Sequence, residues 1–161
     1  MRDGKATTVS VTRRANVLHD ASIERMEDAE LLFESRRWVL SMYAAGVAVE
    51  SLLQAFAIRS GRPYDANHDL RLWLAKCPHA VITTIKGSAI IEWSDVTETW
   101  DNTIRYMSTS GLLGFLKERR LNRKITLGKF GEKAVVKVNA AKLLRAAKVV
   151  HGKGLVLWQS Q

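Results

Sequence analysis

The sequence has 161 residues, the size of one domain, and 47% of them are hydrophobic, which is enough to build a core. This composition excludes disordered, collagen-like and disulfide-dependent proteins. The single cysteine, Cys77, cannot form an intrachain disulfide, and the four scattered histidines lack the spacing of a zinc site. We therefore predict no metal site and no cofactor.

The net charge of +9 is concentrated in one segment. Between Lys117 and Lys153 there are twelve basic and two acidic residues, whereas the rest of the chain carries thirteen basic and fourteen acidic residues. A local excess of this kind is typical of a surface that faces a polyanion. A solvated basic helix face without a partner is the alternative.

The first part of the chain predicts a leader followed by two helices. Residues 1–17 are polar and lack the apolar core of a signal peptide, so we expect a flexible leader and then a single domain over 18–161. Helical periodicity begins near Ala21, and a longer apolar helix follows from Trp38 to about Ser60. Glu50 and Gln54 interrupt that apolar run, which favours a buried helix of a soluble, cytoplasmic protein over a membrane span.

The second half predicts an all-α fold with two ambiguous segments. Short helices are expected at 68–76, from residue 94 onward and at 112–123. Residues 80–93 are rich in β-branched side chains around Lys86-Gly87, so a β-hairpin insertion competes with helix there. Residues 125–138 pose the same choice around a glycine-containing turn.

The segment from Glu132 to His151 predicts an amphipathic helix. At 100° per residue, one face is apolar: Val136, Ala140, Leu143, Leu144, Ala147 and Val150. The opposite face is basic, and together with a preceding basic cluster it supplies the predicted nucleic-acid contacts: Lys137, Lys142, Arg145, Lys148, Arg119, Arg120 and Arg123.

Four stretches in order carry a resemblance to a known family. They are the acidic run Arg25–Leu32, the small-residue helix Tyr43–Glu50 with its Ala-Gly-Val-Ala-Val-Glu pattern, the His68–Arg71 tetrapeptide and the Trp100–Tyr106 stretch. Together they resemble the HEPN domain. The resemblance implies an up-and-down bundle of four or more helices, a homodimer and an association with RNA. It also implies a prokaryotic toxin–antitoxin or defence setting, with a small nucleotidyltransferase as a partner protein.

Nuclease members of that family use an arginine followed four to six residues later by a histidine. Histidine moves protons near neutral pH, and arginine holds a phosphate through two hydrogen bonds. Here the spacing occurs at Arg62–His68 and Arg145–His151, and also between Arg13 or Arg14 and His19. These are weak catalytic candidates, because chance alone produces such pairs in a chain with fourteen arginines.

Three hypotheses follow. The first is a noncatalytic HEPN-like interaction protein that dimerises and binds RNA or a partner enzyme through its basic C-terminal helix. The second is a metal-independent endoribonuclease. The third is a module that docks an acidic partner protein through the same basic face.

Overall fold

The computed structural model of the chain describes residues 3–121 and 127–160, and within them the chain forms seven α-helices and one 3₁₀ helix without a strand. The helices are α1 (Asp3–Glu34), α2 (Trp38–Arg59), α3 (Leu70–Lys76), α4 (His79–Ser88), α5 (Ile90–Thr99), η1 (Asn102–Tyr106), α6 (Thr109–Glu118) and α7 (Leu127–Gln159). The prediction of an all-α helical bundle is confirmed.

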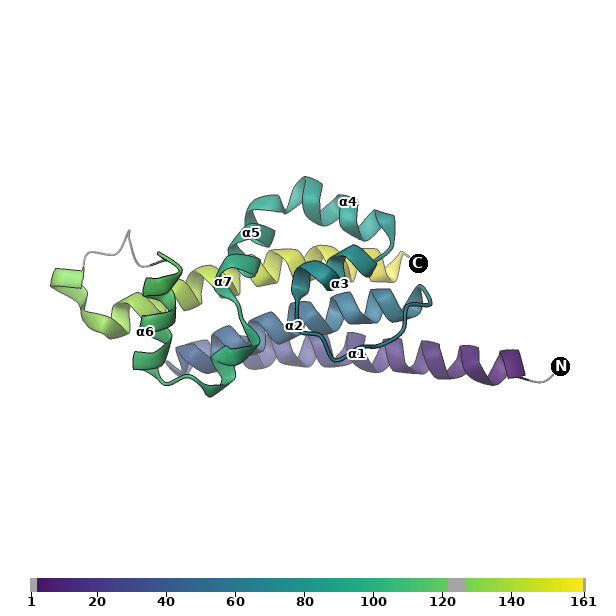
Figure 1. Ribbon diagram of the computed structural model, residues 1–161, viewed down its shortest axis with the longest axis horizontal. Coiled ribbons are helices and arrows are strands. Elements are labelled where there is room, and N and C mark those ends of the chain that lie inside the picture. Colours follow the sequence, from purple (N-terminus) through teal and green to yellow (C-terminus); the bar gives the residue numbers. More distant parts are fainter. Residues whose placement is uncertain (1–2, 122–126, 161) are drawn as a thin grey trace.

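Three long helices form an elongated bundle, as Figure 1 shows. α1 and α2 are an antiparallel hairpin, α7 packs on α2, and the short helices α3 to α6 cover the remaining side. α7 departs from helical geometry at Gly131, where φ is 65°.

α2 is the central helix, and nearly every residue from Ser41 to Ile58 is buried. It is long and apolar enough to cross a membrane by length and composition, but 72% of its most apolar window is buried inside the fold. Such burial is compatible with the core helix of a soluble protein. The largest fully buried side chains include Phe56, Trp73 and Met42.

Gly46 allows Trp100 to lie directly on α2. A Cβ atom on Gly46 would stand 1.9 Å from the indole ring of Trp100. The indole Nε1 atom donates a hydrogen bond to the carbonyl oxygen of Tyr43, at 3.2 Å. The small residue in the middle of α2 therefore determines where the chain between α5 and η1 crosses the bundle.

The apolar face predicted for the C-terminal helix is confirmed. All six of its residues are buried, with exposed fractions of 9% or less. The helix is longer than expected, because it continues past His151 to Gln159. Gly154 allows this extension to pack on α2, because a residue without a Cβ atom leaves room for the side chain of Leu52.

Of the two alternatives for residues 80–93, the structure has helix and not a β-hairpin. Residues 80–88 belong to α4 and residues 90–93 are the start of α5, with a break at Ala89 between the two helices. Val81 and Ile85 are one helical turn apart and both are buried, so burial at helical spacing overrides the strand preference of β-branched residues. In the second expected hairpin, 125–138, residues 127–138 belong to α7, and 125 and 126 lie outside the described residues.

The expected leader also differs from the structure. α1 begins at Asp3, so the described part of 1–17 is helical. Ala15 is fully buried, and the guanidinium of Arg14 lies 4.4 Å from the centre of the Tyr64 ring. The sequence from Met1 to Asn16 has few apolar residues. No helical periodicity of apolar residues therefore indicated that this segment packs on the bundle.

Candidate functional site

A buried carboxylate and a half-exposed histidine meet beside α2. The Nδ1 atom of His68 lies 2.8 Å from the Oε1 atom of Glu50. The same oxygen accepts a hydrogen bond from Nε2 of Gln54, one turn along α2, at 3.0 Å. Because Glu50 occupies Nδ1, the second ring nitrogen of His68, Nε2, is the one available to a ligand.

Glu50 is a costly residue to hold in a core helix. Burial raises the pKa of Glu50, and the hydrogen bond from His68, the charge of His68 and the charge of Arg105 oppose that rise. A buried carboxylate that is tied to a specific histidine is a common feature of functional sites. Ion pairs with a purely structural role share this feature. The groups around the Glu50–His68 pair must therefore show whether the pair is functional.

Successive hydrogen bonds between side chains and backbone amides hold the loop that carries His68. Asp65 Oδ1 accepts from the Asn67 amide at 2.9 Å, and Asn67 Oδ1 accepts from the Asp69 amide at 2.7 Å. Asp69 then caps α3 by accepting from the amides of Arg71 and Leu72. The indole of Trp73 donates to the Asn67 carbonyl, at 2.6 Å. The loop before α3 is thus fixed on both sides of His68.

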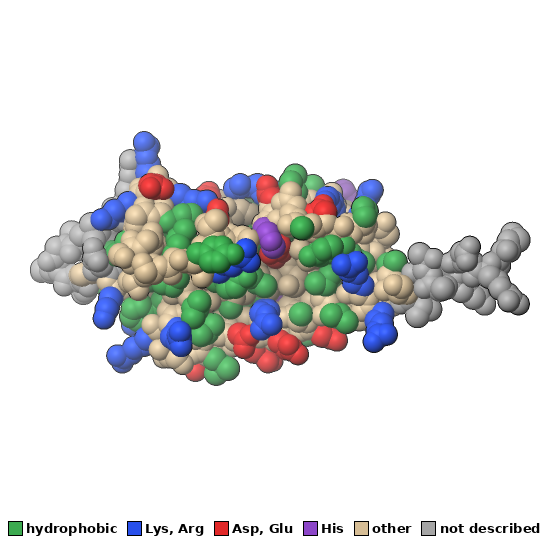
Figure 2. Space-filling view, turned by 60° about the horizontal axis from the view of Figure 1, so that its bottom comes forward, with side chains coloured by type: hydrophobic (Ala, Val, Ile, Leu, Met, Phe, Trp, Pro, Cys, Tyr) green, Lys and Arg blue, Asp and Glu red, His purple; other side chains and the backbone are tan. Residues whose placement is uncertain are grey.

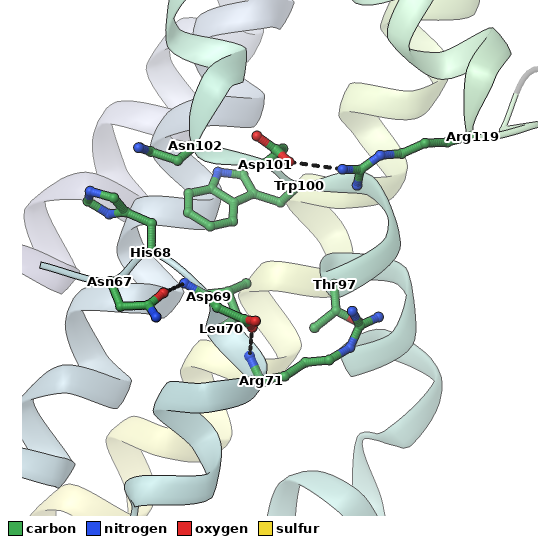
Figure 3. A pocket seen from close by; sticks show the side chains of 10 residues that line it. All are labelled: Asn67, His68, Asp69, Leu70, Arg71, Thr97, Trp100, Asp101, Asn102 and Arg119. Carbon is green, nitrogen blue, oxygen red and sulfur yellow. Dashed lines mark hydrogen bonds and ion pairs between the residues drawn. The ribbon is translucent and has the colours of Figure 1, made fainter.

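His68 opens into a polar pocket of about 340 Å³ between the start of α3 and the end of α5. Figure 3 shows His68 and Asn102 on one side of it, Trp100 in the middle, and Arg71 and Arg119 on the other side. Two carboxylates also line the pocket, Asp69, which caps α3, and Asp101, which pairs with Arg119. The histidine, the asparagine and the remaining arginine suit an anionic ligand.

The two arginines differ in their partners. Arg119 donates to Asp101 Oδ2 at 2.9 Å and to the Glu98 carbonyl at 3.0 Å, so a carboxylate balances its charge. Arg71 donates to the neutral hydroxyl of Thr97 at 3.3 Å, and among the described residues no carboxylate pairs with it. Arg71 is therefore the better candidate to bind a phosphate.

The histidine of the predicted pair Arg62–His68 is in this pocket, but the arginine is not among the described residues that line it. Arg62 is exposed in the turn after α2, where its amide donates to the Ala57 carbonyl. The structure instead places His68 in one pocket with Arg71, while Arg105, the arginine of the family-like Trp100–Tyr106 stretch, acts electrostatically on Glu50.

The second predicted pair, Arg145–His151, is divided between surface and core. Arg145 is exposed, whereas the side chain of His151 is 4% exposed and lies 3.0 Å from the Ser22 hydroxyl. That hydroxyl donates to the His19 carbonyl at 2.6 Å, so Nε2 of His151 must be the donor. Burial lowers the pKa of His151 to about 4, with a smaller contribution from the charge of His19. His151 is therefore a neutral core residue.

The predicted basic surface is partly neutralised within the fold. Lys142 pairs with Asp95 of α5 at 2.6 Å, and Lys148 pairs with Glu30 of α1 at 2.7 Å. Lys137 and Arg145 are exposed. Of the preceding cluster, Arg119 lines the His68 pocket, Arg120 is exposed at the end of α6, and Arg123 lies outside the described residues. Nucleic-acid binding by these residues remains a prediction.

The sequence-based search missed Glu50 and Arg71. One signal was available for Glu50, because it is the only Asp, Glu, Lys, Arg or His residue between Trp38 and Ile58. Arg71 had no such signal, since its role depends on a pocket that three separate segments form.

Comparison of the chain with protein-family models, curated proteins and solved structures finds no match. Within the described residues, no group of three or more His, Cys, Asp or Glu side chains could hold a metal ion.

Proposed function

We propose that this chain is an RNA-binding helical bundle that cleaves RNA without a metal ion, with His68 as the proton-transfer group. The observation that carries the proposal is the Glu50–His68 pair at the edge of a pocket that also contains Arg71. Glu50 orients the imidazole and stabilises its protonated form, as a buried acid does for a catalytic histidine.

The reaction that fits these groups is internal transesterification of RNA. Nε2 of His68 removes the proton of a ribose 2′-hydroxyl, and O2′ forms a bond to phosphorus. The bond from phosphorus to the 5′ oxygen breaks, and the leaving oxygen takes a proton from water. Arg71 neutralises the charge that develops on the phosphoryl oxygens. The products are a 2′,3′-cyclic phosphate and a 5′-hydroxyl end.

The experiment is incubation of purified protein with end-labelled single-stranded RNA in EDTA. We expect cleavage, products with cyclic phosphate ends, and no cleavage of DNA of the same sequence, because DNA lacks the 2′-hydroxyl. Cleavage of both polymers, or of neither, would contradict the proposal.

The interaction hypothesis is a second candidate, and it depends on a different surface. An apolar hollow of about 420 Å³ lies between α1 and α7, lined by Phe33, Leu144 and Val149 and bordered by Arg145 and Lys148. An acidic partner protein or a second copy of the chain would suit that combination. Sedimentation analysis of the protein alone and with a candidate partner tests this function separately from cleavage.

A further inference from the structure

A second hollow, of about 460 Å³, lies at the end of the bundle where α1 turns into α2 and α6 begins. Its apolar part is formed by Trp38, Val39 and Met107, and its rim carries Arg36 and Arg37. None of the described residues that line it is acidic. Figure 2 shows Lys and Arg side chains around this left-hand end, whereas acidic side chains gather along the lower edge.

Arg36 has an unusual backbone for its residue type. It ends α1 with φ of 60°, and the hydrogen bonds Arg36 N–H to Phe33 O and Arg37 N–H to Leu32 O close the turn. This left-handed position normally favours glycine, which adopts it without a steric cost. Arg36 therefore carries its guanidinium to the rim of the hollow on a backbone conformation that glycine would adopt more easily.

Two further features add positive potential at this end. Ser108 and Thr109, at the N-terminal end of α6, line the hollow, and that end of a helix carries a partial positive charge. Lys137 is exposed and directly follows Val136, another lining residue.

The hollow is connected to the His68 pocket by one short segment. Asn102 lines the pocket and Met107 lines the hollow, and the 3₁₀ helix η1 runs between them. Five residues at the rise of a 3₁₀ helix cover about 10 Å. Arg105 and Tyr106 lie on this path, both exposed, and the Tyr106 ring is 76% exposed.

We infer that this hollow is a binding subsite for single-stranded RNA, in which an unpaired base stacks against Trp38 and the adjoining phosphates contact Arg36 and Arg37. A planar aromatic wall beside cations is the arrangement that holds unpaired bases. An acidic peptide would use the cations but would leave the aromatic wall without a planar partner. The inference takes its ligand class from the proposed function, although the two sites share no described lining residue.

The test is fluorescence anisotropy with a labelled 2′-O-methyl oligouridylate, which the proposed reaction cannot cleave. Arg36→Gly should weaken binding at least about fivefold while it raises the melting temperature, because glycine relieves the left-handed strain. Arg25→Ala is the charge-matched control, since Arg25 lies on α1, pairs with Asp28 and does not line the hollow. It should leave the affinity little changed.

The stacking of a base on Trp38 is tested first with the wild-type protein. An oligonucleotide with abasic residues should bind roughly tenfold more weakly than the full one, and Trp38→Leu should abolish that difference. Equal weakening by Arg36→Gly and Arg25→Ala would overturn the inference, as would equal affinity for the abasic oligonucleotide or tighter binding of polyglutamate. Binding that follows the expected pattern without any RNA cleavage would contradict the proposed function alone.

Discussion

The Nδ1 atom of His68 lies 2.8 Å from the Oε1 atom of Glu50, and the two side chains are 44% and 6% exposed respectively. The pair therefore joins the core of the bundle to the solvent-filled pocket. A carboxylate in this position costs folding free energy, and in return it orients one imidazole ring. The first prediction separates these two effects.

Glu50→Gln should stabilise the fold or leave it unchanged at pH 7, while it lowers any RNA cleavage at least about tenfold. Burial raises the pKa of Glu50 above its usual 4.5, so ionisation costs more in the folded than in the unfolded chain. The gain should be present at pH 7 and vanish well below pH 4.5, where the carboxyl is protonated in both states. Thermal unfolding at the two pH values measures it. Lower stability at pH 7 would show that the pair is mainly structural.

Gly46→Ala should destabilise the protein by roughly 1–3 kcal/mol, because its Cβ atom would overlap the Trp100 ring. Trp100 lines the His68 pocket, so oligonucleotide binding should weaken as well. Gly87→Ala is the matched control: its Cβ would meet no atom within 4 Å, and alanine in α4 should add up to about 1 kcal/mol of stability. Urea denaturation of both variants gives the comparison. Equal stability of the two would be inconsistent with this packing.

Two of the three long helices, α2 and α7, could be predicted from the sequence because their signals are local. The apolar run of α2 and the 100° periodicity of α7 identify both helices and their buried faces. At 80–93 the sequence could not decide between helix and hairpin, since the burial of Val81 and Ile85 depends on contacts from distant segments. The site could likewise be predicted only in part. His68 was a candidate, but its partner Glu50 lies eighteen residues away in the sequence and contacts it only in the folded chain.

Acid should destabilise the protein through His151. The pKa of this buried imidazole is about 4, below its usual 6.5, so between these values the unfolded chain binds a proton that the folded chain does not. Stability should therefore fall as the pH decreases from 6.5 to 4, by up to about 3 kcal/mol. His151→Gln, which can still donate to Ser22, should flatten this dependence in urea titrations at pH 7 and pH 4.5. An unchanged slope in the variant would contradict the assignment.

The basic residues of α7 should contribute unequally to RNA binding. Lys137→Glu combined with Arg145→Glu should weaken binding by tenfold or more at low salt and reduce its salt dependence, because both side chains are exposed. Lys142→Gln combined with Lys148→Gln should have a smaller effect, since Asp95 and Glu30 already pair with these lysines. Anisotropy titrations from 50 to 200 mM salt test the difference. Equal losses in both double variants would indicate a response to net charge alone.

The most direct test of the central claim is the rate of RNA cleavage by His68→Ala, measured in EDTA beside the wild-type protein and His79→Ala. His79 is an exposed histidine of α4 that contacts Thr83, so its replacement removes an imidazole without touching the pocket. We predict that His68→Ala loses cleavage by a factor of 100 or more, on the order expected for loss of an acid–base group, while His79→Ala keeps the wild-type rate. Cleavage by His68→Ala at the wild-type rate would contradict the account.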